Sequence, residues 1–267
     1  MSDTSSQALR RVWTIGDYRV IARHLLPISV ETVTALDIQR GERVLDVGVG
    51  NGNAAIEAAR RGASVTGIDL TPTQIDLARA RCADEGVDVD LRVGDAQSLD
   101  VPDASFDVVL SVMGMIFAPD HMRAAAEMAR ACRPGGRVAI TAWDGGGWSS
   151  RWRDRTSHLL PPPPLGAPKP DEWGNAEEFG RRLAAAGLEA TVVERSFEFR
   201  FPSVGQALEV FLGAAGPFVQ LMEIASSVGH GEEVVDELRA ALEEANQVED
   251  DSCLLPSPYL LAMGRRS

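Results

Sequence analysis

"RVLDVGVGNGNAAIEAARRGASVTGIDL", which runs from Arg43 to Leu70, decides the fold. It contains an apolar run, three glycines at alternate positions, an alanine-rich stretch of helical length, and a second apolar run that ends in Asp69. This order is typical of a strand, a glycine turn, a helix and a second strand parallel to the first. Two questions follow: which small molecule the turn binds, and why a carboxylate, Asp46, stands just before it.

The same alternation continues along the chain. Apolar runs predict five strands, at 43–48, 63–69, 89–95, 105–113 and 135–143. Three helices are predicted between them, near 51–61, 72–85 and 120–132. Strands separated by helices indicate parallel βαβ units with right-handed crossovers. Uninterrupted apolar runs indicate strands that are covered on both faces.

The flanking segments are less regular. Residues 8–38 predict two helical segments broken near Pro27, and a Gly/Pro-rich loop after Trp143 predicts one helical turn around Trp152. The remaining predicted elements are a helix at 175–187, a strand at 189–201, apolar helices at about 204–228 and 231–247, and a last strand at 258–265. We therefore predict a single domain over 1–267, divided into an N-terminal helical lid (1–40), a cofactor-binding core (41–145) and a segment (146–267) that completes the sheet and carries substrate-cap helices at about 203–247.

Composition and charge limit the function classes. The formal net charge of −13 disfavours nucleic-acid and anionic membrane partners, because it repels phosphate groups. The three cysteines are far apart and form neither a metal-binding spacing nor a disulfide framework. The N-terminus has no apolar signal core, and no apolar run reaches about 18 residues. We expect a cytoplasmic protein without a resident metal, present as a monomer or homodimer.

The glycine turn differs from a dinucleotide-binding turn. Its glycines are Gly48, Gly50 and Gly52, and the place of the third glycine of the dinucleotide fingerprint is taken by Asn53. Asp46 lies two residues before the first glycine, where a pyrophosphate would be repelled. A cationic ligand such as S-adenosylmethionine, which carries an ammonium and a sulfonium, would be attracted. The alternative is that Asp46 only accepts hydrogen bonds from the amides of the turn.

Two further acidic residues end the next two strands. Asp69 ends the second strand, where an acid can bind both hydroxyls of a ribose, a feature shared with NAD enzymes. Asp95, within "GDA" (94–96), follows the third strand, where it can accept a hydrogen bond from an adenine amino group. Each acid alone could cap a strand, but three at successive strand ends favour an adenosyl ligand.

These motifs resemble those of class I S-adenosylmethionine-dependent methyltransferases, of the type that includes the ubiquinone/menaquinone-biosynthesis enzymes. "VLDVGVGNG" is similar to the family's first motif, "VTGIDL" to its acidic second-strand motif, and "RPGGRVAI" to its turn into the fifth strand. The resemblance covers residues 43–143, with Val49 and Asn51 departing from the usual turn. It implies a Rossmann-like sheet of seven strands, with the last strand antiparallel and helices on both faces.

The same resemblance implies the cofactor-binding residues. Asp46 and the three glycines would hold the methionine part, Asp69 and Leu70 the ribose, and Gly94, Asp95 and Ala96 the adenine. Ser111 would lie beneath the sulfonium. Trp13 and Tyr18, in the N-terminal segment, are candidates to close over the cofactor, or else they pack a short helix.

The methyl acceptor is less well defined. The fourth strand ends in "SVMGMIFAP", without the Asn/Asp-Pro-Pro-aromatic element of amino-methylating DNA enzymes, which favours a small organic acceptor. The candidate pocket residues are apolar and lie in the loops and the C-terminal helices: Met115, Phe117, Trp143, Trp173, Phe211 and Phe218. Such residues often belong to the core instead.

Two histidines are candidate general bases. His121 follows the fourth strand, close to the active edge, although it could also be an exposed first-turn residue. His24 lies at roughly helical spacing from Trp13, Asp17 and Ile21, or it could pack in the core. We predict methyl transfer to a metabolite or natural product, with O-, N- and C-methylation all open. The alternatives are structural use of S-adenosylmethionine for a cyclisation or rearrangement, and a non-catalytic binding protein.

Overall fold

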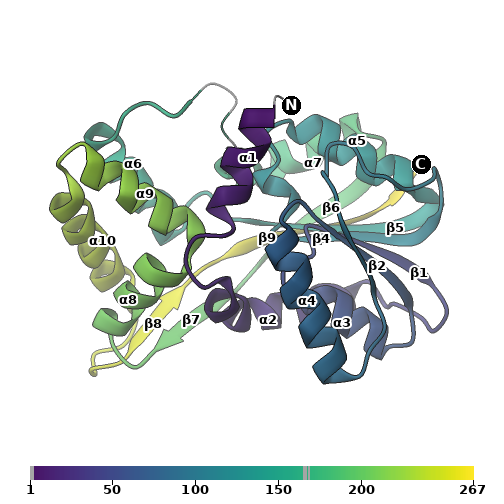
Figure 1. Ribbon diagram of the computed structural model, residues 1–267, viewed down its shortest axis with the longest axis horizontal. Coiled ribbons are helices and arrows are strands. Elements are labelled where there is room, and N and C mark those ends of the chain that lie inside the picture. The colour runs from purple at the N-terminus through teal and green to yellow at the C-terminus, as the bar shows by residue number, and fades with distance from the viewer. Residues whose placement is uncertain (1–2, 165–166, 168) are drawn as a thin grey trace. The chain divides into compact units, whose positions relative to one another are not determined.

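The computed structural model describes residues 3–164, 167 and 169–267 (Figure 1). The chain forms two compact units. The first, here called the helical unit, comprises Met1–His24, Gly145–Leu165 and Ser196–Pro258. The second, the sheet unit, comprises Leu25–Asp144, Gly166–Arg195 and Tyr259–Ser267. Neither unit is one continuous segment, whereas the lid, core and completing segment predicted from the sequence are consecutive.

The sheet unit contains a seven-stranded sheet. In chain order its strands are β1 (Arg43–Val47), β2 (Ser64–Asp69), β3 (Asp90–Val93), β4 (Phe106–Val112), β5 (Cys132–Trp143), β6 (Leu188–Arg195) and β9 (Tyr259–Arg266). Their order across the sheet is β3-β2-β1-β4-β5-β9-β6. β9 is antiparallel to both β5 and β6, and the other pairs are parallel. The predicted fold class is confirmed.

Helices cover both faces of this sheet (Figure 1). In the sheet unit they are the later part of α2 (Tyr18–Ala35), α3 (Asn53–Arg60), α4 (Pro72–Glu85), α5 (His121–Ala131) and α7 (Ala176–Ala185), with short turns η1 (Met115–Phe117) and η3 (Pro170–Trp173). α3 and α4 pack on β1 to β3, and α5 and α7 pack on the other face. α4 begins with a proline at its first position, where no hydrogen bond is lost, and ends at Gly86 in the left-handed conformation. Its predicted bounds are confirmed.

The strand order reverses at β1, which pairs with β2 on one side and β4 on the other. Loops that leave the carboxyl ends of β1 and β4 therefore run in opposite directions. In open α/β sheets ligands bind at this point, because the diverging loops leave a crevice there. The glycine turn follows β1, so the sheet places it where a small molecule is expected.

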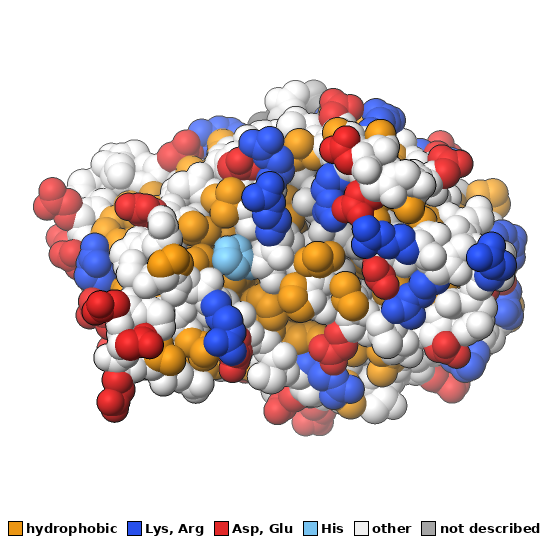
Figure 2. All heavy atoms as spheres, turned by 90° about the horizontal axis from the view of Figure 1, so that it is seen from below, with side chains coloured by type: hydrophobic (Ala, Val, Ile, Leu, Met, Phe, Trp, Pro, Cys, Tyr) orange, Lys and Arg blue, Asp and Glu red, His pale blue; other side chains and the backbone are white. Residues whose placement is uncertain are grey.

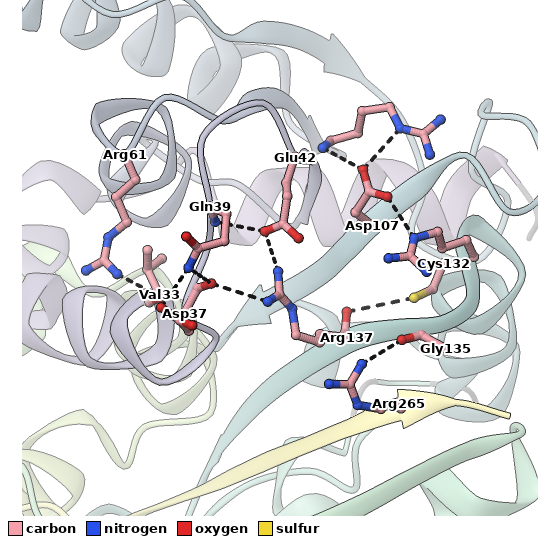
Figure 3. Close-up of polar contacts among 12 residues, drawn as sticks. Val33, Asp37, Gln39, Glu42, Arg61, Asp107, Cys132, Gly135, Arg137 and Arg265 are labelled. Carbon is pink, nitrogen blue, oxygen red and sulfur yellow. Dashed lines mark hydrogen bonds and ion pairs between the residues drawn. The ribbon is translucent and has the colours of Figure 1, made fainter.

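A network of ion pairs joins three strands at the opposite, amino edge of the sheet (Figure 3). Asp107, near the start of β4, accepts hydrogen bonds from the backbone N–H of Arg43 at 2.9 Å and from Nε of Arg133 at 2.7 Å. Burial disfavours the charge of Asp107, but these donors outweigh it and hold the pKa of Asp107 well below its ordinary value. Arg137 of β5 pairs with Glu42, which precedes β1. The network fixes the ends of β1, β4 and β5 relative to one another.

The helical unit surrounds a cluster of aromatic rings. Its elements are α1 (Asp3–Val12), the start of α2 (Tyr18–Ala35), α6 (Trp148–Thr156), η2 (Ser157–Leu159), α8 (Val204–Ala214), α9 (Gly216–Ser227), α10 (Gly231–Ala245) and a two-stranded sheet of β7 (Glu198–Phe201) and β8 (Cys253–Pro256). Phe218 stacks on Trp152 with ring centroids 4.8 Å apart and lies 5.2 Å from Phe211. Trp148 and Phe199 pack against Phe211 as well. This cluster is the hydrophobic core of the unit.

Several predicted boundaries outside residues 43–143 are wrong. The N-terminal helices are separated at residues 13–17, where Gly16 has φ of +76°, and Pro27 lies inside α2. The predicted strand 189–201 is two strands in different sheets, β6 and β7. The predicted helix 204–228 is α8 and α9, which meet at an angle of 85°. α6 is longer than the single turn expected around Trp152, and β8 was not predicted.

Among the described residues no single helix is long and apolar enough to cross a membrane, whereas the bent pair of α8 and α9 passes by length and composition alone. On the face that Figure 2 shows, basic and acidic side chains are interspersed.

Candidate functional site

Asp46 is a buried carboxylate at the end of β1. Its side chain is 2% exposed and accepts a hydrogen bond from the backbone N–H of Ala55, in the first turn of α3. Burial raises the pKa of Asp46 to about 7, with a further contribution from the neighbouring charge of Asp69. A buried acid of this kind favours a cationic partner, since such a partner would offset both causes of the shift.

Asp69, at the end of β2, organises the glycine turn. One of its carboxylate oxygens accepts the N–H of Gly50 and the other accepts the N–H of Thr71, both at 2.9 Å. Burial raises the pKa of Asp69, and the hydrogen bonds oppose that shift. Asp46 and Asp69 together make this end of the crevice acidic.

The turn needs glycine at three positions. Gly48, Gly50 and Gly52 all have positive φ, between 53° and 91°, which other residues rarely adopt. The side chain of Val49 lies against Gly67 of β2, where an added Cβ would be 2.8 Å from Cγ2 of Val49. The departure from the family turn at Val49 is therefore accommodated by a glycine on β2.

A second glycine pair joins the turn to the loop after β4. A Cβ on Gly48 would lie 2.8 Å from Cα of Gly114, and a Cβ on Gly114 would lie 2.9 Å from the carbonyl oxygen of Val47. Ser111 spans the same gap: its hydroxyl donates to the Val47 carbonyl at 2.5 Å and accepts the N–H of Met115 at 2.9 Å. Ser111 is fully buried, so it acts on this edge by holding η1 against β1.

Gly94, Asp95 and Ala96 form the half-buried turn after β3. A carboxylate oxygen of Asp95 accepts the backbone and side-chain N–H groups of Gln97, each at 2.9 Å. The Gln97 side-chain oxygen in turn accepts the N–H of Asp120, the residue before α5. Gln97, which the sequence reasoning missed, therefore ties the predicted adenine segment to the loop after β4. Leu70 is half-buried beside Asp69.

Met113, an apolar residue that the sequence offers for the acceptor pocket, has a strained backbone in the structure. It lies at the carboxyl end of β4 with φ of +53°, an unfavourable conformation for a side chain of this kind. The hydroxyl of Thr141 accepts its N–H at 2.9 Å. Strained residues cluster at functional sites, but no pattern in the sequence reveals the strain itself.

His121 is the first residue of α5 and is 7% exposed, so the alternative of an exposed residue is wrong. Its Nδ1 lies 3.1 Å from a guanidinium nitrogen of Arg182, and its ring lies 5.3 Å from that of Trp173. Because Arg182 can only donate, Nδ1 accepts, and the proton of the neutral ring lies on Nε2. This arrangement is unlike that of a general base, which needs a free lone pair.

The other predicted residues fall into two groups. In the sheet unit, Met115 and Trp173 are fully buried, while Phe117 and Trp143 are half-buried. In the helical unit, Phe211 and Phe218 belong to the aromatic core, and the His24 ring packs 4.8 Å from that of Phe201. Trp13 and Tyr18 make an edge-to-face contact at 5.8 Å, with Trp13 in the turn before α2. The helical spacing inferred between Trp13 and His24 is therefore wrong.

Among the described residues no group of three or more His, Cys, Asp or Glu side chains could hold a metal ion. The three cysteines, Cys82, Cys132 and Cys253, are buried, and none of them forms a disulfide.

The sheet order, the antiparallel last strand and the acidic strand ends around a glycine turn define the class I methyltransferase fold. Comparisons with known proteins support the same assignment. Residues 44–136 match a family described as a methyltransferase domain. The 27-O-demethylrifamycin SV methyltransferase of Amycolatopsis mediterranei is 33% identical over 204 residues, which are 71% of this chain and 70% of that protein. This chain belongs to the S-adenosylmethionine-dependent methyltransferase family.

Two further similarities show how far the likeness extends. An uncharacterized protein of Mycobacterium tuberculosis is 41% identical over 169 residues, which are 63% of this chain and 62% of that relative. The chain thus spans less than two thirds of that relative's length. The crystal structure of the YcgJ protein from Bacillus subtilis has a TM-score of 0.60 with 17% identity and covers 89% of this chain and 97% of that one. That likeness concerns the fold alone.

Proposed function

We propose that this chain transfers the methyl group of S-adenosylmethionine to a hydroxyl oxygen of an organic natural product. The observation that carries the cofactor part is the pair of buried carboxylates, Asp46 and Asp69, beside a glycine turn at the carboxyl edge of the sheet. A pyrophosphate would be repelled there, whereas an ammonium group would be attracted.

The residues of this edge fit the cofactor. Asp46 would offset the ammonium charge, Asp69 would accept hydrogen bonds from the ribose, and Asp95 with Ala96 would hold the adenine. When bound, S-adenosylmethionine supplies a methyl group on a positively charged sulfur. The chain's own task is to orient the acceptor and exclude water, because positioning alone can lower the barrier of such a displacement by several kcal/mol.

The acceptor part rests on the relatives. The name of the Amycolatopsis relative specifies methylation of an oxygen on a rifamycin. The formal net charge of −13 suits a small organic acceptor better than a nucleic acid, and on the face that Figure 2 shows the basic side chains are interspersed with acidic ones.

Calorimetry tests the cofactor. S-adenosylhomocysteine, the demethylated product, should bind with a Kd of about 10 µM or tighter at pH 8, and NAD should give no heat of binding. NAD binding without any response to S-adenosylhomocysteine would refute the proposal.

Label transfer tests the reaction. The protein should move radioactive methyl from S-adenosylmethionine onto an organic compound when supplied with 27-O-demethylrifamycin SV and with hydroxylated metabolite extracts. Tight binding with no transferred label in any mixture would favour the structural or non-catalytic use of the cofactor. If the transferred label survives treatment with base but is released by reagents that cleave ethers, the methyl group is on a hydroxyl oxygen as a methyl ether.

A further inference from the structure

His121 and Trp173 form a buried pair of rings in the sheet unit. His121 begins α5, directly after the loop that follows β4, and Trp173 ends η3, which packs against β5 and η1. The two side chains are 7% and 0% exposed, and their ring centroids are 5.3 Å apart. The pair therefore lies at the same edge of the sheet as the glycine turn.

Arg182 determines which atom of His121 carries the proton. Glu178 accepts from Nε of Arg182 at 2.6 Å and Glu172 accepts from a terminal nitrogen at 2.9 Å, so the guanidinium is held in place. Its other terminal nitrogen donates to Nδ1 of His121 at 3.1 Å. Burial lowers the pKa of His121, and the charge of Arg182 lowers it further, against smaller opposing effects of Glu172, Asp120 and the Ile116 backbone. His121 is therefore neutral at pH 7 to 8, with its proton on Nε2.

Both rings are left with a buried donor. Within the described part of the chain neither Nε2 of His121 nor Nε1 of Trp173 makes a hydrogen bond of ordinary geometry, and the backbone of Ile116 has only the smallest of the effects on the pKa of His121. Buried N–H groups are nearly always paired, because losing their hydrogen bonds to water costs free energy. Two such donors on adjacent rings favour an oxygen acceptor from outside the described part of the chain.

The charges around the two rings indicate which chemical group carries the oxygen that accepts from them. Arg182 lies 5.5 Å from the centre of the Trp173 ring, but its guanidinium is paired with Glu172 and Glu178, which also pair with Lys169 and Arg181, so the nearby cations are already engaged by carboxylates. The two ring donors suit a carbonyl oxygen, which has two lone pairs, better than a phosphate or a carboxylate, which would also need a free cation.

We propose that His121 and Trp173 bind a carbonyl oxygen of the methyl acceptor, so that the enzyme selects hydroxylated ketones, esters or quinones. This inference rests on the proposed methyltransferase function. It replaces the sequence-based role of His121 as a general base with that of a hydrogen-bond donor.

Two aromatic probes that differ in one group test the pair. 2-Hydroxyacetophenone carries a carbonyl beside its hydroxyl, and 2-ethylphenol has the same outline without the carbonyl oxygen. With S-adenosylhomocysteine bound, the wild-type protein should bind the ketone about tenfold more tightly than the ethyl compound. The ketone should also shift the indole N–H resonance of Trp173 in ¹⁵N–¹H spectra.

Three variants show whether this preference arises from the pair. Trp173→Phe and His121→Phe keep an aromatic ring but lose the donor, and each should reduce the preference to about twofold or less. Trp152→Phe is the matched control, because Trp152 is equally buried but donates to the carbonyl of Val234 at 3.3 Å, and it should keep the preference. Melting temperature and S-adenosylhomocysteine affinity are measured for each variant.

The outcomes separate the two proposals. The carbonyl site is overturned if the wild type binds the two probes equally, or if the preference for the ketone survives Trp173→Phe. Normal binding of S-adenosylhomocysteine in those experiments would leave the proposed methyltransferase function intact. A ¹⁵N histidine spectrum that shows the His121 proton on Nδ1 also overturns the carbonyl site. If His121→Phe does not fold, the wild type and Trp173→Phe decide the question.

Discussion

Asp46 combines two roles that the sequence reasoning treated as alternatives. It accepts an amide hydrogen bond from the helix after the turn, and its charge is buried beside that of Asp69. The hydrogen bond is structural, whereas the buried negative charge lowers stability when no cation is bound beside it. The residue is thus better suited to a bound ligand than to the empty protein.

The pH dependence follows from the direction of the shift. An unfolded aspartate has a pKa of about 3.9, whereas that of folded Asp46 is raised to about 7, mainly by burial. Between these values the folded protein holds a proton that the unfolded chain has lost. The contribution of Asp46 to stability is therefore present below about pH 4 and is lost as the pH rises to about 7.

Asp46→Asn should stabilise the cofactor-free protein and weaken cofactor binding. At pH 8 the free energy of unfolding should rise by on the order of 2 kcal/mol, because the amide keeps the shape without the buried charge, and the gain should vanish toward pH 4. S-adenosylhomocysteine affinity should fall by roughly ten- to a hundred-fold with loss of a charge-assisted contact. Urea unfolding across this pH range and calorimetry at pH 8 measure both.

Asp107→Asn is the matched control at the other edge of the sheet. Asp107 loses its ion pairs with Arg43 and Arg133 in this variant, so stability should fall while S-adenosylhomocysteine affinity stays normal. An Asp46→Asn protein that behaves in the same way as this control would assign Asp46 a structural role only.

At the scale of elements, the carboxyl edge of the sheet depends on close contact between the turn after β1 and the loop after β4. Gly48 and Gly114 approach each other backbone to backbone, and Ser111 bonds both sides of the gap. The sequence predicts Gly48 through its motif, but Gly114 belongs to no recognisable pattern.

Gly114→Ala should disrupt this contact. Gly114 has φ of −101°, so the added methyl group is not excluded by backbone strain but by the Val47 carbonyl oxygen 2.9 Å away. The loop would have to move, at a cost of about 1–3 kcal/mol in the free energy of unfolding, with a weaker affinity for S-adenosylhomocysteine. Urea unfolding and calorimetry measure the two effects.

Gly180→Ala serves as the comparison for that variant. Gly180 lies within α7, where an added Cβ meets only a methyl group of Val192 at 3.7 Å. Alanine favours a helix over glycine, so this variant should be as stable as the wild type or more so. Equal stability and affinity in the two variants would show that the Gly48–Gly114 approach is unimportant.

The elements that the sequence predicts well are those whose signals are local. The strands β1 and β2 and the helix α4 have their own apolar runs, glycines and caps, and their predicted bounds agree with the structure to within a residue or two. β8 and the break between β6 and β7 depend on pairing between residues about 55 apart in the chain, which no local pattern encodes. The same holds for His121 and Trp173, whose partnership depends on how η3 packs on η1.

At the scale of the whole molecule, the N-terminal segment belongs to the helical unit. Gly16 packs against the end of α8, where an added Cβ would lie 2.8 Å from the carbonyl oxygen of Ala214. Arg11 pairs with Glu223 of α9 at 2.7 Å, although both side chains are about half exposed, so the pair contributes little stability. The bend between α8 and α9 therefore packs closely against residues 12–16, through Gly16 and Gly216.

Gly216→Ala should disrupt this packing. Gly216 is the first residue of α9, and a Cβ on it would overlap the carbonyl oxygen of Val12. Hydrogen exchange in peptides that cover residues 7–18 should then become at least several-fold faster, while exchange in the sheet-unit peptide 43–70 should stay unchanged, because local opening follows the contacts of each segment. Gly213→Ala is the control, since its Cβ meets nothing within 4 Å, and its exchange should match that of the wild type.

The same pair of variants tests the predicted roles of Trp13 and Tyr18. These rings pack on each other in the segment that packs against Gly216. If they contribute to cofactor binding, S-adenosylhomocysteine affinity should fall in Gly216→Ala by roughly five- to tenfold and remain normal in Gly213→Ala, because a released segment must be ordered again at an entropic cost on binding. Normal affinity together with faster exchange would assign Trp13 and Tyr18 to the packing of the helical unit alone, and unchanged exchange would show that the packing at Gly216 does not hold this segment.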